Sequence, residues 1–301
     1  QGMHGFTENK QLHVDDLDHA LAAPTDKRIF FLSQALHAGY SIDRLHELTK
    51  IDRWFLSKLK KLADFEIALE QRGLTAERYE QGKNLGYPDK TLLRLSGAEA
   101  LPAESKKAVY KMVDTCGGEF MAERPYFYGT HDDVSSDETK PFMNPDKKTV
   151  VVLGSGPIRI GQGIEFDYCC VHASKALKKL GFETIIVNCN PETVSTDYDT
   201  SDRLYFEPLT LEDVLSIHDK EKPVGVIAQF GGQTPLNLAA DLKKAKPQVS
   251  VLFGGPEVSY DSAEFMQNNA FLSQPITIAS NVSWETVIEI EAKALTLEGI
   301  T

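Results

Sequence analysis

The chain has 301 residues, and its 44 Asp and Glu outnumber its 32 Lys and Arg, which gives a formal net charge of −12. With 42% hydrophobic residues, it has the composition of a globular protein with material for one large or two modest cores. A general nucleic-acid binder needs a basic face for phosphates, and the acidic balance argues against one. We therefore expect no nucleic-acid partner.

The sequence carries no membrane or secretory signal. Mean hydropathy is −0.28, and no stretch approaches the roughly 20 apolar residues that span a bilayer. The four cysteines, at positions 116, 169, 170 and 189, are too few and too irregularly spaced for a disulfide scaffold or a zinc site. We expect a cytoplasmic protein with reduced thiols and no membrane partner. Its first and last residues lead us to expect a piece of something longer.

The N-terminal part of the chain predicts helices. Residues 1–25 are polar, and we expect them to be the tail of a preceding domain. Apolar residues then recur at intervals of three and four, which is typical of amphipathic helices, and no alternating strand is evident. The sequence predicts an all-α domain over residues 26–121, with Trp54 and the pair Phe30 and Phe31 as core aromatics.

The character of the sequence changes after that domain. Residues 122–147 are rich in Gly, Pro, Ser and Asp without hydrophobic periodicity, so we expect an extended linker. Residues 148–265 alternate apolar runs with helical patterns, and such runs imply a parallel sheet covered on both faces. The predicted fold class is therefore α/β, a helical domain followed by a Rossmann-like parallel-sheet domain. Strands are expected at residues 149–154, 184–188, 224–229 and 249–254.

A glycine-rich turn follows the first expected strand and leads into a helix. Glycines there let backbone amides approach an anion, and a helix N-terminus adds partial positive charge. The turn is neither a dinucleotide fingerprint nor a P-loop. Arg159 stands at the third glycine position, the second strand runs into Asn188 and Asn190 without an acidic residue, and no Gly-Lys-Ser/Thr follows. This disfavours a nucleotide-binding oxidoreductase, and the pattern favours ligand binding and simple turn geometry equally.

Polar clusters follow the later strands, where parallel sheets bind ligands. The Asn-Pro-Glu at residues 190–192 has two interpretations. It can start a helix, with Asn as the N-cap and Pro in the first turn. Alternatively, Arg159, Glu165 and Glu192 line one polar crevice above the sheet. Position alone favours the helix start, while a charged crevice would suit a small anionic or polar species.

The paired cysteines lie within an expected helix. Adjacent helical residues point roughly 100° apart, so Cys169 and Cys170 do not converge on a metal, and we expect them to pack in the core. His172 on the same helix is expected to be packed or solvated rather than catalytic. From these patterns we assign no catalytic residue, no metal ligand and no cofactor-binding residue.

Three long runs resemble the large subunit of carbamoyl-phosphate synthetase. Residues 156–173 contain Gly-Gln-Gly-Ile-Glu-Phe-Asp-Tyr-Cys-Cys, residues 187–208 contain Pro-Glu-Thr-Val-Ser-Thr-Asp-Tyr-Asp, and residues 231–236 read Gly-Gly-Gln-Thr-Pro-Leu. These strings resemble the second of the two homologous synthetase halves in that subunit. The helical part resembles the oligomerisation domain that joins the halves. The likeness covers about residues 24–255.

The resemblance implies a domain order, a reaction and partners. It implies an oligomerisation domain at residues 26–121, a pre-ATP-grasp domain at 148–265, and a candidate truncated ATP-grasp start at 266–301, whose nature is uncertain. The family is a ligase that makes carbamoyl phosphate from bicarbonate, glutamine-derived ammonia and two ATP with Mg²⁺, for arginine and pyrimidine biosynthesis. Implied partners are a glutaminase small subunit or fused glutaminase domain, the remaining large subunit, and further copies in a homo-oligomer.

The resemblance also implies a carbamate tunnel. Carbamate decomposes readily in water, so a closed conduit protects it. The positions that match tunnel-lining residues of the family are Arg159, Gly163, Glu165 and Glu192.

Two departures from the family pattern limit what is expected of this chain. Ser155 and Ile158 stand where the family has Gly and Asn, which can reshape the glycine-rich turn. Nothing downstream supplies the lysines, arginines and metal-binding carboxylates of an ATP-grasp domain. We therefore expect the chain alone to be inactive and to bind neither ATP nor Mg²⁺. The alternative is a non-catalytic scaffold or regulatory fragment built on the same folds.

Overall fold

The computed structural model describes Phe6, Leu12 and residues 14–102, 105–131, 137–157, 164–228 and 230–252. The chain divides into two compact units, residues 1–106 and residues 107–301, and each is described by itself. Within the described residues, no helix combines the length and apolar character needed to cross a membrane.

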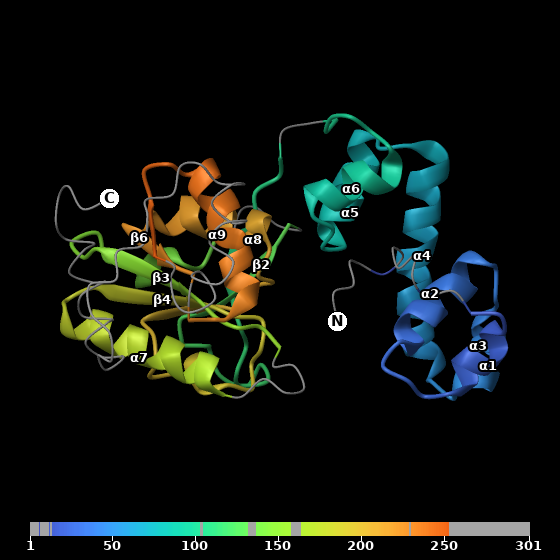
Figure 1. Ribbon diagram of the computed structural model, residues 1–301, viewed down its shortest axis with the longest axis horizontal. Coiled ribbons are helices and arrows are strands. Elements are labelled where there is room, and N and C mark those ends of the chain that lie inside the picture. The colour runs from blue at the N-terminus through green and yellow to red at the C-terminus, as the bar shows by residue number, and fades with distance from the viewer. Residues whose placement is uncertain are drawn as a thin grey trace, which may run out of the picture. The chain divides into compact units, whose positions relative to one another are not determined.

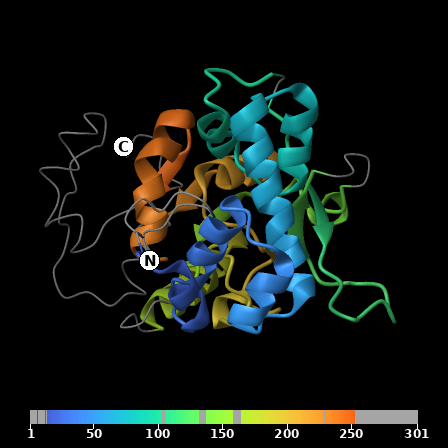
Figure 2. The ribbon, with the colours of Figure 1, turned by 90° about the vertical axis from the view of Figure 1, so that its right-hand side faces the viewer.

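The described part of the first unit is helical. A hydrophobic cluster lies against each half of its longest helix, α4, which runs through the unit in Figures 1 and 2. Leu45 and Leu56 are fully buried in the first cluster, and Leu69 and Leu92 are fully buried in the second. The helices are α1 (Leu17–Ala22), α2 (Arg28–His37), α3 (Ile42–Thr49), α4 (Arg53–Arg72), α5 (Ala76–Asn84) and α6 (Asp89–Ser96).

Trp54 departs from the expected packing. Phe31 is buried as predicted, but Trp54 is 60% exposed, so its expected place in the core is wrong. The Asp52 side chain accepts a hydrogen bond from Trp54 N at 2.8 Å and starts α4 there. The core-facing position of the first turn is Leu56, and the Trp54 ring lies outside, 4.9 Å from Lys58 Nζ.

The described part of the second unit is a seven-stranded sheet flanked by helices. Spatial strand order is β1-β2-β5-β4-β3-β6-β7, and neighbouring strands are parallel except for the antiparallel pair β1 and β2. This confirms the predicted α/β fold class. The strands are β1 (Val109–Met112), β2 (Tyr126–Thr130), β3 (Thr149–Leu153), β4 (Glu183–Val187), β5 (Arg203–Tyr205), β6 (Gly225–Ile227) and β7 (Ser250–Leu252).

Helices cover both faces of this sheet, as the continuous apolar strands predict. They are α7 (Glu165–Lys179) on one face and α8 (Leu211–Glu221) with α9 (Gln233–Ala245) on the other (Figure 1). Alternate residues of β3 supply the two cores: Val152 packs with α7, and Val151 packs with α8 and α9. Two short 3₁₀ turns, η1 (Lys140–Phe142) and η2 (Val194–Thr196), complete the described elements.

The structure differs from the expected organisation before residue 148. Residues 122–147, expected to be a linker, contain β2, which pairs with β5 in the sheet. β1 lies within the region expected to be all-α and pairs with β2. Residues 1–25, expected to be a tail, include α1, and its Leu21 is fully buried in the helical core. Strands this short show no hydrophobic periodicity in the sequence, and β5, the strand that pairs with β2, lies more than 70 residues further along the chain. The sequence therefore did not predict them. Residues 266–301 lie outside the described part.

Candidate functional site

The candidate site is the carboxyl edge of the parallel strands. The chain leaves β3 at the centre of the sheet and later returns on its other side at β6, so the strand order reverses between these two strands. In open α/β sheets, ligands bind where loops diverge at such a reversal. The loops that meet here are residues 154–157 after β3, 188–196 after β4 and 230–232 after β6.

The glycines of these loops allow close backbone packing. A Cβ at Gly154 would lie 2.6 Å from Asn188 Cγ, and a Cβ at Gly231 would collide with the carbonyl oxygen of Gly154. Gly156 has φ of +67°, in the region that favours glycine. Turn geometry and packing therefore account for these three glycines.

Asn188 joins two of the loops. Its side chain is fully buried, and its Oδ1 accepts hydrogen bonds from Gly156 N at 3.1 Å and Asn190 N at 3.2 Å. Its Nδ2 lies 3.3 Å from Ser195 Oγ and donates to it. An amide provides an acceptor and a donor in one side chain, so Asn188 fixes the loop after β3 against the loop after β4. In the sequence, Asn188 indicates only that the ribose-binding acid of a dinucleotide site is missing.

Asp167 is a second buried polar residue at this edge. It lies in the first turn of α7, and its Oδ2 accepts a hydrogen bond from Ser195 N at 3.0 Å. Its Oδ1 is buried and has no hydrogen-bond partner in the described part of the chain. The sequence analysis did not single it out, although a carboxylate in a first helical turn is a recognisable signal.

Two of the four predicted tunnel residues can be located. Glu165 is the first residue of α7, and Glu192 lies between β4 and η2; both are exposed in this chain. Arg159 and Gly163 lie outside the described residues. The enclosed passage therefore stays a prediction.

The expected helix start at residues 190–192 is wrong. Asn190 Oδ1 does accept a hydrogen bond from Glu192 N at 3.1 Å, but the chain forms a local turn there and then the short η2, not an α-helix. An Asx turn uses the same side-chain acceptor as a helix N-cap, so the sequence pattern cannot distinguish the two.

Glu207 is an ionisable group at the same end of β5. Burial raises the pKa of its carboxyl group to about 7, although Gly129 N donates a hydrogen bond that opposes the shift. A Cβ at Gly129 would lie 2.8 Å from Glu207 Oε1, so the glycine lets the carboxylate reach the β2 backbone. Sequence reasoning missed this group because β2 was not expected.

The cysteines behave as packing residues. All four are free thiols. Cys170 is fully buried between α7 and the sheet, and its Sγ lies 3.7 Å from the Leu153 carbonyl oxygen, while Cys169 is half-buried. Burial raises the pKa of both thiols, so neither is activated as a thiolate. Among the described residues, no three His, Cys, Asp or Glu side chains are grouped to hold a metal ion.

The class of protein follows from two family models that match adjacent parts of the chain. Residues 1–112 match the oligomerisation domain of the carbamoyl-phosphate synthetase large chain. Residues 146–259 match the carbamoyl phosphate synthase preATP-grasp domain, and these include the five strands β3 to β7 and the loops at their carboxyl edge.

Curated relatives agree with the family models. The chain is 50% identical over 270 residues to the carbamoyl phosphate synthase large chain of Methanothermobacter thermautotrophicus, covering 87% of this chain and 24% of that protein. It is 44% identical over 284 residues to that of Archaeoglobus fulgidus, covering 90% and 26%. It is 51% identical over 242 residues to that of Myxococcus xanthus, covering 76% and 22%. The chain belongs to the carbamoyl phosphate synthase large-chain family and spans roughly a quarter of the length of these relatives.

Proposed function

We propose that this chain is the central part of a glutamine-dependent carbamoyl phosphate synthase, an ATP-dependent ligase. The observation that carries the proposal is the match of two large-chain domains, in order, within one chain. In this proposal residues 26–121 support oligomerisation, and residues 148–265 form part of the carbamate passage. Identity of 44–51% over most of the chain supports the same role as in the relatives.

The carbamate passage is proposed for the edge where the loops after β3 and β4 meet. Asn188 and Asp167 hold these loops together, which gives Glu165 and Glu192 fixed supports. Arg159 and Gly163, which lie between Gly156 and Glu165 in sequence, are proposed to line the same passage. In the whole protein, other parts of the large chain would close the passage and exclude water from the carbamate.

ATP and Mg²⁺ would supply the phosphoryl-transfer chemistry of the whole enzyme. The described residues do not fit that role. No three His, Cys, Asp or Glu side chains among them are grouped to hold a metal ion. The Asn188 side chain packs against Gly154 in the glycine-rich turn, where a nucleotide phosphate would have to lie. In this proposal, nucleotide binding belongs to parts of the enzyme outside this chain. The chain alone is proposed to be inactive.

The remaining expectations belong to the same proposal. The partners would be a glutaminase subunit or fused glutaminase domain, the other parts of the large chain and further copies of this chain. A cytoplasmic location and a role in arginine or pyrimidine biosynthesis would follow. A non-catalytic scaffold remains the alternative, although no observation here favours it.

A chimeric enzyme tests the proposal. This chain would replace the corresponding quarter of the M. thermautotrophicus large chain, and glutamine-dependent carbamoyl phosphate formation would be measured beside the unaltered enzyme. We expect the chimera to form product. A chimera that assembles normally, as judged by sedimentation, but forms none would contradict the proposal and favour the scaffold.

A further inference from the structure

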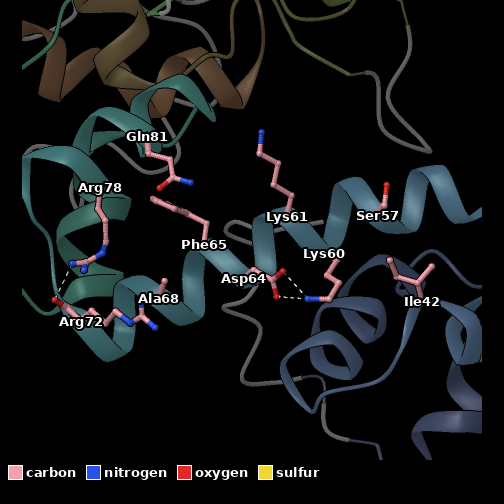
Figure 3. Close-up of a pocket in the computed structure, with 10 residues that line it drawn as sticks. All are labelled: Ile42, Ser57, Lys60, Lys61, Asp64, Phe65, Ala68, Arg72, Arg78 and Gln81. Carbon is pink, nitrogen blue, oxygen red and sulfur yellow. Dashed lines mark hydrogen bonds and ion pairs between the residues drawn. The ribbon is translucent and has the colours of Figure 1, made fainter.

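An elongated groove runs along α4 in the helical unit. It has a volume of about 520 Å³, and its lining extends from Ile42 on α3, along α4, to Arg78 on α5 (Figure 3). Ser57 and Arg72 mark its extent on α4, about 22 Å at 1.5 Å per residue. That length suits an extended polypeptide segment better than a compact small molecule.

The groove combines an apolar floor with a basic rim. Its apolar lining consists of Ile42 and Ala68, which are half-buried, and of Phe65, which is only 4% exposed. Lys61 and Arg72 line the groove, are exposed, and have no hydrogen-bonding or ion-pairing side-chain partner in the described part of the chain. The fitting occupant is a segment with apolar side chains flanked by carboxylates.

Two other cations of the groove have local partners. Lys60 pairs with Asp64 at 2.6 Å, and Arg78 donates hydrogen bonds to the carbonyl oxygens of Arg72 and Gly73 at 2.9 and 2.6 Å. The Arg78 bonds occupy orphan carbonyls at the end of α4, and its guanidinium has further donors. The groove therefore keeps net positive charge although the chain is acidic.

The loop between β1 and β2 offers a segment of the required chemistry. Phe120 is 74% and Met121 is 90% exposed, and Glu119 and Glu123 flank them. Two adjacent large apolar side chains at such exposure indicate a contact surface rather than scattered surface residues. The loop lies in residues 107–301, which carry almost all of the net charge of −12, because acids and bases nearly balance in residues 1–106.

The structure presents this loop in a defined turn. Cys116 N donates a hydrogen bond to Asp114 Oδ1 at 3.0 Å, and Glu119 N donates one to the Cys116 carbonyl oxygen at 3.2 Å. Gly117 and Gly118, with φ of +62° and +79°, allow the reversal. A preformed turn lowers the ordering cost of binding.

We propose that the Glu119–Glu123 loop of one copy docks into the α4 groove of a second copy. Phe120 and Met121 would cover the floor, and the two glutamates would meet Lys61 and Arg72. The inference rests on the proposed oligomerisation role and names the surfaces that perform it. It also explains why both features are exposed in the single chain.

Cysteine cross-linking tests the contact directly. In a Cys116→Ser background, one preparation carries Met121→Cys and the other carries Ala68→Cys, so only an intermolecular contact can join the new thiols. On mixing under mild oxidation we expect a disulfide-linked heterodimer, and far less with Lys90→Cys, an exposed α6 position outside the groove, in place of Ala68→Cys. Equal yields of the two disulfide-linked heterodimers would overturn the proposal.

Self-association of the otherwise unaltered chain gives an independent readout. Phe120→Asp should weaken it by about tenfold or more, as expected for a central aromatic contact, while Val194→Asp, at another exposed apolar position, should not. Lys61→Glu with Arg72→Glu should weaken it too, and adding Glu119→Lys with Glu123→Lys should restore it.

These outcomes separate the inference from the proposed function. If the chain self-associates but Phe120→Asp has no effect, the docking surface is wrong and the oligomerisation role stands. If the chain stays monomeric and forms no cross-link, the docking surface and the oligomerisation role are both wrong. The synthase role is then still judged by the chimera.

Discussion

Asn188 Oδ1 accepts a hydrogen bond from Gly156 N at 3.1 Å, and this contact joins the turn after β3 to the turn after β4. Both turns carry residues proposed to face the carbamate. The geometry of the candidate site therefore depends on the buried amide side chain of Asn188, which is not ionisable. Its neighbour Gly154 leaves the space that this side chain occupies.

Asn188→Leu should destabilise the chain. It leaves the buried N–H group of Gly156 and the half-buried N–H group of Asn190 without an acceptor, and one unsatisfied buried group costs about 1–3 kcal/mol. Urea unfolding followed by circular dichroism measures the change. Asn84→Leu, at an exposed position on α5, is the control and should alter the free energy of unfolding by less than about 0.5 kcal/mol. Equal effects of the two changes would contradict this role.

Arg203→Met should be more costly. Arg203 is buried, its Nη1 lies 2.8 Å from Glu183 Oε2, and its Nη2 lies 3.2 Å from Glu221 Oε2. Removing one partner from a buried ion pair leaves an uncompensated charge and costs about 3–5 kcal/mol.

The control for Arg203 is an exposed ion pair. Arg53 Nε lies 2.7 Å from Asp43 Oδ1, and both side chains are largely exposed. Arg53→Met should cost no more than about 1 kcal/mol. Thermal or urea unfolding of both variants compares their stabilities. If Arg203→Met destabilises the chain less than Arg53→Met does, the buried ion-pair network contributes little.

Glu207 predicts a pH dependence of stability. Its pKa is raised from 4.5 to about 7 in the folded chain, so the folded state binds more protons than the unfolded state between these values. The stabilisation is present below about pH 4.5 and is lost as the pH rises through about 7, by at most about 3 kcal/mol. Glu207→Gln should remove this component. The difference between variant and parent unfolding curves from pH 4.5 to 8 measures it, and a constant difference would refute it.

A substitution at Gly163 in the chimera should uncouple ATP hydrolysis from carbamoyl phosphate formation. A large side chain at Gly163 should narrow the proposed passage, so Gly163→Leu should lower carbamoyl phosphate formation by about tenfold or more while bicarbonate-dependent ATP hydrolysis continues. Gly163→Ala is the control and should act more weakly. Parallel loss of both activities in Gly163→Leu would argue against a passage at this position.

Much of the α/β unit could be predicted from the sequence because its signals are local. The strands β3, β4 and β6 read as largely apolar runs, since every residue of each is buried in the sheet. The packing of the paired cysteines against the core was predicted correctly from helical geometry alone. The long motifs also gave the family, which the comparisons bear out.

Tertiary structure decided the features that depend on distant partners. β1 and β2 are short, and they become strands only because β2 pairs with β5 and β1 pairs with β2. Trp54 and Phe120 read as ordinary apolar residues, and their exposure follows from which neighbours fill the core. Asn188 acquires its role from a backbone group of another loop, 32 residues away in sequence, and Glu207 from a backbone group of β2, 78 residues away. Local periodicity records which residues avoid water, but only the assembled fold determines which polar groups meet.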